Sequence, residues 1–124
     1  MRNKTKLRIF LGAVLVLSSP AFAHHGAANY DTEKSVTLTG TVTDLQFTNP
    51  HVLVSVNVKD PSTGKVVEWR GELTSPNRLS RSGWSKSTLK PGDQVTLSGS
   101  PSKSGAPTMS IRELKKGDQE ISTR

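Results

Sequence analysis

Valine at every second position over 51–59, alternating with mostly polar residues, is the feature that most constrains the fold of this chain. Valine stands at every second position of this stretch, at Val52, Val54, Val56 and Val58. Side chains of a β-strand point to its two faces in turn, so the pattern predicts a strand with one buried face. Turn signals bound it on both sides, since Asn-Pro precedes it and Asp-Pro-Ser-Thr-Gly follows it.

Two further strands are predicted on either side of this one. Residues 36–48 read as a long strand whose apolar phase changes after Val42, which indicates a bulge or bend, with Gly40 as the expected kink. Residues 66–73 predict a third strand, with the odd-numbered positions from Val67 to Leu73 toward the core. Long, bent first strands are typical of small closed barrels.

A short helix is predicted between the third strand and the last two. Ser75 is suited to its N-cap, Pro76 to its first position and Gly83 to its end. Residues 94–98 and 109–114 then alternate as two more strands. Three strands, a helix and two strands is the order of the oligonucleotide/oligosaccharide-binding (OB) fold, a five-stranded, partly open Greek-key barrel. The predicted class is therefore all-β with one short helix; a small β-sandwich is the alternative, which the helix position disfavours.

The first 23 residues have the pattern of a secretory signal peptide. Four basic residues precede the apolar run 9–17, and small residues stand before His24 at the positions that signal peptidase reads. We expect cleavage after Ala23 and a periplasmic or secreted protein. The apolar run is shorter than the roughly 20 residues of a membrane-spanning helix, and no later segment reaches that length, so the mature form is expected to have no membrane span.

The mature chain expected after cleavage is small and weakly basic. It has 101 residues and carries +3, because four of the 17 Lys and Arg lie in residues 1–23 and all ten Asp and Glu lie after them. The expected organisation is a flexible N-terminal arm over 24–35, anchored by Tyr30, a barrel over 36–115 and a polar C-terminal tail over 116–124. Such a low charge disfavours nucleic acid as a partner, and the absence of cysteine excludes disulfides and thiol catalysis.

Cleavage after Ala23 would place His24 and His25 at the new N-terminus, a free amine beside two imidazoles. Nitrogen ligands in this arrangement suit Cu(II), which stands highest in the divalent affinity series and favours tetragonal sites. The only other histidine, His51, would complete a metal site if the arm folds back beside the second strand. The alternative is that the histidine pair is cleavage-site context and that His51 only hydrogen-bonds its turn.

A second candidate site is the turn between the first two strands. In an OB fold this loop rims the usual ligand face, so Asn49 and His51, with Trp69 nearby, are candidate ligand-binding residues. The alternative assigns the turn to barrel geometry and the tryptophan to core packing. A third candidate is the basic group of Arg78, Arg81 and Lys86, which could bind an anionic partner. The alternative is that these residues form a solvated face of the helix.

Enzyme activity is not expected, and no catalytic residue is assigned. The sequence contains no Gly-x-Ser-x-Gly elbow, no His-Glu-x-x-His helix and no glycine-rich phosphate loop. The hypothesis that remains is a binding module, with copper or another divalent metal as a possible ligand. Its alternatives are recognition of a protein, glycan or small ligand by the barrel face, and a structural envelope protein with no small ligand.

Several short motifs resemble a family of small secreted bacterial proteins of unknown function. The resemblance implies an exported OB-like β-barrel and no particular activity. One departure is Gly-Ala-Ala after the histidine pair, where such proteins often carry serine and an aromatic residue. The motifs that carry the resemblance are His24-His25-Gly26, the strand with Val36, Gly40 and Val42, Thr48-Asn49-Pro50-His51, Val67-Glu68-Trp69, Ser75-Pro76-Asn77 with Leu79, Gly83-Trp84 and Leu89-Lys90-Pro91-Gly92-Asp93.

Overall fold

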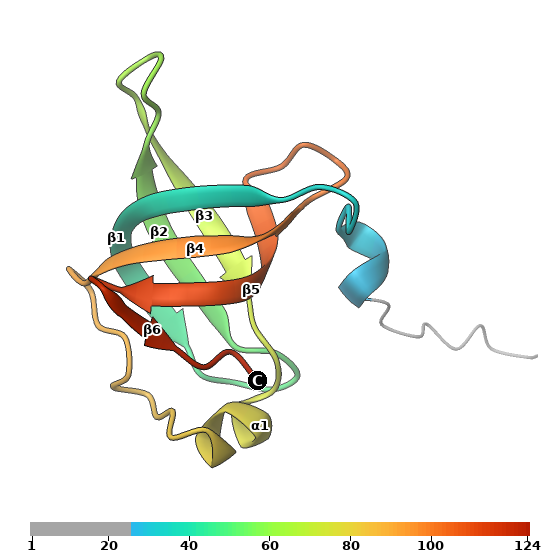
Figure 1. Cartoon of the computed structure of the whole chain (residues 1–124), viewed down its shortest axis with the longest axis vertical. Coiled ribbons are helices and arrows are strands. Elements are labelled where there is room, and N and C mark those ends of the chain that lie inside the picture. Colours follow the sequence, from blue (N-terminus) through green and yellow to red (C-terminus); the bar gives the residue numbers. More distant parts are fainter. Residues whose placement is uncertain (1–25) are drawn as a thin grey trace, which may run out of the picture.

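The computed structural model describes residues 26–124, which form an all-β fold with one short α-helix, as the sequence predicts (Figure 1). The predicted signal peptide, together with His24 and His25, lies outside the described residues. Each predicted strand corresponds to an observed one with ends shifted by a few residues. The elements are the 3-10 helix η1 (Gly26–Asn29), β1 (Val36–Gln46), β2 (Leu53–Lys59), β3 (Val66–Glu72), α1 (Pro76–Arg81), β4 (Gln94–Pro101), β5 (Thr108–Lys116) and β6 (Gln119–Ile121).

The strands form one sheet that closes on itself. Their order is β3-β2-β1-β4-β5-β6, and β3 also pairs with β5. The closing pair is parallel, with Gly71 opposite Met109, whereas neighbours along the order run antiparallel. Strands β1 to β5 therefore make the predicted five-stranded barrel, with α1 at one of its ends (Figure 1).

The barrel interior is filled by alternate side chains of its strands. All four valines of the alternating stretch are buried, which confirms the face predicted for β2. Leu79 of α1 and Trp84 just after it are also buried, so the helix contributes to the core at its end of the barrel. Each such side chain contributes about 1.5–3 kcal/mol through removal from water. The core consists of Val42, Val52, Val54, Val56, Val58, Leu73, Leu79, Trp84, Leu89, Val95, Leu97, Met109, Ile111 and Leu114.

The hairpin of β2 and β3 extends past the barrel, and this corrects one predicted core position. Alternation predicts Val67 on the core face, but this residue is 38 % exposed, and its neighbour Val66 is 61 % exposed. The reason is visible in Figure 1, where the tip of the hairpin projects beyond the other strands and leaves both faces of its end without a covering layer.

Strand β1 bends, as the change of its apolar phase predicts, but not at the expected residue. The pairing of β1 with β2 shifts register between Val42 and Asp44, which places the bulge at Thr43. Gly40 serves a different purpose, because a Cβ atom there would overlap the backbone carbonyl oxygen of Asn57. The glycine therefore permits the close approach of two backbones rather than the bend.

Helix α1 begins and ends where its capping residues predict. Ser75 is the N-cap, and its Oγ accepts a hydrogen bond from the backbone N–H of Arg78 at 3.4 Å. Pro76 is the first helical residue. Gly83, with φ of +89°, follows the C-cap residue Ser82 in the left-handed conformation that suits glycine.

The C-terminal residues differ from the predicted polar tail. β5 continues to Lys116, Gly117 turns the chain at φ +59°, and β6 pairs with β5, with Ile121 opposite Leu114. Ile121 also packs against the core. The prediction was wrong because one apolar residue and a glycine turn suffice to add a short strand to an existing edge, where the partner's backbone groups are already in place.

The N-terminal arm, in its described part, is attached to the barrel. Tyr30 forms an antiparallel bridge with Ser102, in the loop that joins β4 to β5. The backbone N–H of Asp31 donates to the carbonyl of Pro101 at 2.9 Å. Tyr30 thus anchors the arm as predicted, but the residues around it are hydrogen-bonded to the barrel rather than forming a free, flexible extension.

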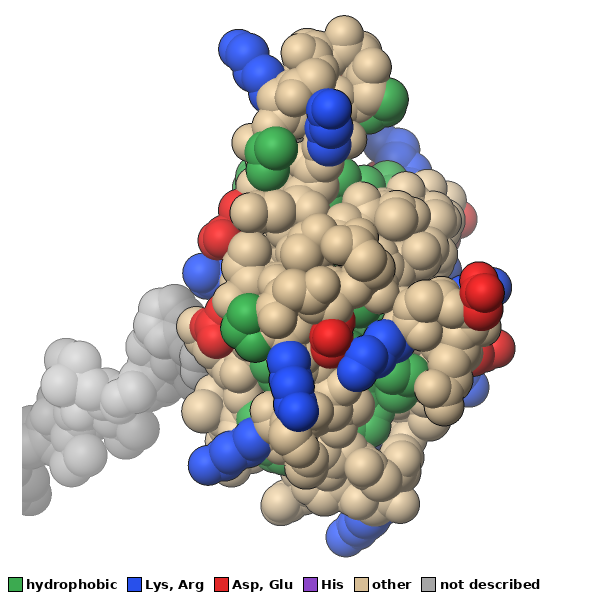
Figure 2. Space-filling view, turned by 90° about the vertical axis from the view of Figure 1, so that its left-hand side faces the viewer, with side chains coloured by type: hydrophobic (Ala, Val, Ile, Leu, Met, Phe, Trp, Pro, Cys, Tyr) green, Lys and Arg blue, Asp and Glu red, His purple; other side chains and the backbone are tan. Residues whose placement is uncertain are grey.

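Charged side chains are scattered over the face of the barrel that Figure 2 presents. Lys and Arg side chains stand singly there, some beside an Asp or Glu, and no extended patch of one sign covers this face. Within residues 26–124, no helix has both the length and the hydropathy needed to cross a bilayer.

Candidate functional site

His51 lies at the entrance to β2 and is paired with a carboxylate. It follows the Asn49-Pro50 turn, whose peptide bond is cis, and its Nδ1 atom contacts Oε1 of Glu72. The strand register explains this contact. Leu53 stands opposite Glu72, and the backbone N–H of Leu73 donates to the carbonyl of Val52 at 2.8 Å. His51, which precedes Val52, therefore lies beside the end of β3.

The same carboxylate also holds the N-terminal arm. The hydroxyl of Tyr30 donates a hydrogen bond to Oε2 of Glu72 at 2.7 Å, in a partly buried position. Burial and the neighbouring carboxylate, in that order, raise the pKa of Tyr30 well above its ordinary value, so the phenol stays protonated and remains a donor. Glu72 therefore binds one side chain from the β1–β2 turn and one from the arm, each on its own oxygen.

This arrangement fixes the chemistry of the imidazole. A carboxylate is an acceptor, so Nδ1 of His51 carries the proton that Glu72 accepts, and Nε2 is the ring nitrogen not engaged by this contact. The His51 side chain is 40 % exposed, so the ring is accessible from solvent. Metal-ligating histidines in proteins commonly have their second ring nitrogen oriented by a carboxylate in this way. The His51–Glu72 pair is thus suited to present one nitrogen ligand.

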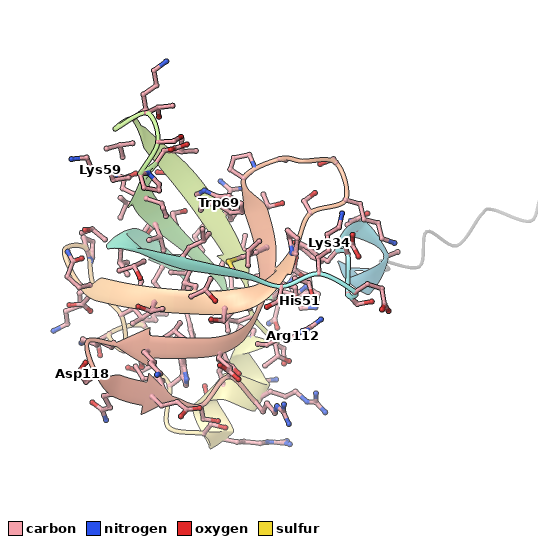
Figure 3. All side chains as sticks on the ribbon, turned by 45° about the horizontal axis from the view of Figure 1, so that its top comes forward. Lys34, His51, Lys59, Trp69, Arg112 and Asp118 are labelled. Carbon is pink, nitrogen blue, oxygen red and sulfur yellow. The ribbon has the colours of Figure 1, made fainter. Side chains whose placement is uncertain are left out.

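Arg112 of β5 holds the arm at a second point. Its Nη2 atom donates to the carbonyl of Thr32 at 3.0 Å and to the Oγ of the buried Ser100 at 2.5 Å. Figure 3 shows His51 and Arg112 on the side of the barrel where the arm enters β1. The arm is therefore held against the barrel at Tyr30 by Glu72, and two residues later by Arg112.

The three residues predicted to bind a ligand are not brought together. Asn49 is exposed in the same turn as His51. Trp69 is on β3, three residues before Glu72, which corresponds to about 10 Å along the strand and to the opposite face of it. Figure 3 shows Trp69 toward the β2–β3 hairpin, away from His51. The tryptophan is only partly buried and lines a shallow hollow of about 180 Å³ with Leu38 and Val58.

The predicted metal site is divided between the described residues and the segment before them. Within residues 26–124, no three His, Cys, Asp or Glu side chains lie close enough together to hold a metal ion. His24 and His25 lie outside that range. Sequence reasoning also missed Glu72 and Arg112, whose only signal is their outward position on alternating strands. Their partners depend on the register of β2 with β3 and on the path of the arm.

The sequence matches a known family profile over most of its length. The profile is described as a family of unknown function, DUF6152, and it covers residues 13–111. No curated protein matches the sequence.

Two solved structures resemble the barrel at low sequence identity. One is a mitochondrial single-stranded DNA binding protein from S. cerevisiae, Rim1, with a TM-score of 0.50 and 6 % identity over 66 % of this chain and 91 % of that one. The other is TiaS in complex with a tRNA and ATP, with a TM-score of 0.49 and 19 % identity over 75 % of this chain and 20 % of that one. At such identities the first likeness concerns the fold alone, and the second supports no further comparison.

Proposed function

Because the chain belongs to DUF6152, a family of unknown function, its activity has to be inferred from its own residues, and we propose that it is an exported module that binds a divalent metal ion, with Cu(II) the best suited. His51 is the ligand on the barrel. His24, His25 and the amine released by cleavage after Ala23 supply the other nitrogens. Export is part of the proposal, since it creates that amine.

The observation that carries the proposal is the double use of Glu72. One carboxylate binds both His51 and Tyr30, so the arm lies near the imidazole at Tyr30. Tyr30 follows His25 by five positions along the chain. A chain of that length spans at most about 18 Å when fully extended. Because Gly26–Asn29 form η1, the proposal requires this segment to extend or turn back so that the histidine pair meets His51, whereas the barrel itself needs no change.

The chemistry of these donors favours copper. An α-amine titrates near 7.7 and an unperturbed imidazole near 6.5, so a neutral solution contains the deprotonated forms that bind metal. An amine, imidazoles and an intervening amide nitrogen can occupy the positions of a tetragonal Cu(II) site. The orienting contact from Glu72 to His51 belongs to the same design, because such contacts typically contribute about 10–100-fold to metal affinity.

The test is a Cu(II) titration of the mature protein against a competing chelator. Protein is purified from the periplasm and its N-terminus is checked by intact mass, which tests cleavage after Ala23 separately. The wild type should bind Cu(II) at least about tenfold tighter than a free His-His-Gly peptide, and His51→Ala should remove that advantage. Asn49→Ala is the matched control, since it alters the same turn without removing an imidazole. Equal affinities of wild type, His51→Ala and peptide would reject the folded site.

A second candidate function rests on Trp69. An aromatic ring that is partly exposed beside an apolar hollow is a common stacking surface for sugars and other planar or apolar ligands. This candidate predicts binding that survives deletion of residues before Tyr30 and is lost in Trp69→Ala. Titration of both variants with soluble glycan fragments, followed by intrinsic fluorescence, tests this candidate. The metal hypothesis differs from it, because deletion of the residues before Tyr30 would remove metal binding.

A further inference from the structure

Three arginines gather at the end of the barrel that α1 covers. Arg78 and Arg81 are three residues apart in α1, so they share one side of the helix. Arg124 joins them from the C-terminal segment, and together they line a hollow of about 470 Å³. The volume falls within the range of small-ligand pockets. Figure 1 shows the end of the chain next to α1, in agreement with these contacts.

The C-terminal segment is fixed in place by hydrogen bonds. The indole N–H of Trp84 donates to the carbonyl of Ser122 at 2.7 Å, and the Thr123 hydroxyl donates to the carbonyl of Arg112 at 2.6 Å. The hydroxyl of Ser82, at the end of α1, contacts the carbonyl of Arg124. These bonds hold the backbone of Arg124 beside α1, so the hollow is formed by fixed segments of the fold.

The side chains that line the hollow include three positive charges and no negative one. Its remaining lining residues are Thr74, Ser82 and Thr123, all with hydroxyl groups, and no Asp or Glu side chain lines it. None of the ion pairs found among residues 26–124 involves Arg78, Arg81 or Arg124. Positive charges that line the same hollow repel each other, and an anion bound among them lowers that cost.

We infer that this hollow binds a phosphate group. Guanidinium forks match the oxygens of phosphate in a bidentate manner. Three guanidinium groups offer more donors than the roughly four acceptor positions of a carboxylate can use, whereas a phosphate group spreads its acceptors over more oxygens. The hydroxyls of Ser82 and Thr123 already donate to backbone oxygens, which leaves Thr74 as the remaining hydroxyl of the lining. The site is independent of the proposed metal site, because it contains no imidazole and does not involve the arm. Its ligand is either free phosphate or pyrophosphate, or the headgroup of an anionic phospholipid.

The test compares two variants of equal charge change. Arg78→Gln with Arg81→Gln removes two charges from the hollow, and Lys59→Gln with Lys65→Gln removes two from the exposed end of the β2–β3 hairpin. Each full-length protein is titrated with inorganic phosphate and pyrophosphate by calorimetry at constant ionic strength. In a second arm, each is mixed with vesicles of phosphatidylglycerol in phosphatidylcholine, with pure phosphatidylcholine as the blank. Thermal unfolding confirms that all variants fold.

The expected result is a loss of at least about tenfold in affinity for the arginine variant and little change for the lysine variant. Binding of the free anions alone identifies a soluble phosphate ligand, and binding of the vesicles alone identifies a headgroup; either supports the site. A further variant, Arg78→Lys with Arg81→Lys, should bind weakly despite its unchanged charge, because lysine lacks the planar fork. Equal losses in the arginine→glutamine and lysine→glutamine variants, or no binding by the wild type, would overturn the inference.

Discussion

Replacement of Glu72 by glutamine is the sharpest test of how the arm and the β1–β2 turn are joined. A carboxylate offers an acceptor on each oxygen, and in this protein one oxygen serves His51 and the other Tyr30. The glutamine amide is nearly identical in shape but has one acceptor and one donor group. It can therefore accept from only one of the two partners, must donate to the other or lose it, and no longer carries the negative charge that strengthens both contacts.

The magnitude follows from the exposure of the partners. A hydrogen bond to a charged group contributes about 1.5–3 kcal/mol when buried. The His51 side chain is 40 % exposed and that of Glu72 is 21 % exposed, so the histidine contact belongs to the exposed class of about 0–1 kcal/mol. The Tyr30 contact, at 2.7 Å and partly buried, should contribute about 1–1.5 kcal/mol. Glu72→Gln should thus lower the free energy of unfolding by about 1–2 kcal/mol.

Urea unfolding followed by tryptophan fluorescence measures this loss, since Trp84 is buried in the folded protein. With an m value of about 1.5 kcal/mol/M, the midpoint should fall by about 1 M. A double-mutant cycle with Tyr30→Phe should give a coupling energy of about 1 kcal/mol. Glu113→Gln, an exposed carboxylate on β5, is the control and should change the midpoint little. A coupling energy below about 0.3 kcal/mol would refute the shared contact.

Three other substitutions test the barrel. Gly99→Ala should lower the free energy of unfolding in urea by about 3 kcal/mol or more, because the added Cβ would overlap the carbonyl oxygen of Ser110. A variant with the stability of the wild type would contradict this. Trp84→Phe should cost about 2 kcal/mol and increase amide exchange in the C-terminal segment, because the 2.7 Å bond to Ser122 is lost; unchanged exchange would show that this bond does not hold the segment. A hydrogen bond from the Lys90 backbone N–H, together with Lys116, lowers the pKa of Asp93 below its ordinary value. The contribution of Asp93 to stability is therefore present above about pH 4 and is lost as the pH falls through the folded-state pKa. Asp93→Asn should flatten this acid limb of the stability curve, and an unaltered limb would assign it to other carboxylates.

The order of strands and the ends of α1 could be predicted because their signals are local. The valines at every second position of 52–58 identify a buried face without knowledge of any partner strand. Ser75 and Pro76 specify a helix start through their own hydrogen-bonding and φ preferences. The sequence also indicated that β1 changes phase. It did not locate the bulge, because Gly40 is required for a close approach to Asn57 and gives the same local signal as a bend.

The candidate site was only partly predictable because its contacts join distant segments. His51 was recognised as a chemically useful residue, but its partner Glu72 depends on the register of two strands and Tyr30 on the path of the arm. β6 was missed for a similar reason, since its one apolar residue gains its stability from an edge that β5 supplies. The arginine hollow combines Arg78 and Arg81 of the predicted basic group with Arg124, whose position depends on that same missed strand. Lys86, the third member of the predicted group, lies after the end of α1 and does not line the hollow.

The parallel pairing that closes the barrel also sets the order in which it can assemble. β1 with β2 and β2 with β3 are hairpins of adjacent segments, whereas Val36 pairs with Gly99 and Gly71 with Met109 across long stretches of chain. Such distant pairings lose loop-closure entropy before any contact compensates for it, so they form late and slowly. Until β4 and β5 arrive, the three-stranded meander exposes two unpaired edges, which are templates for association with other chains. A newly made chain is thus most vulnerable to aggregation before its last strands join the sheet.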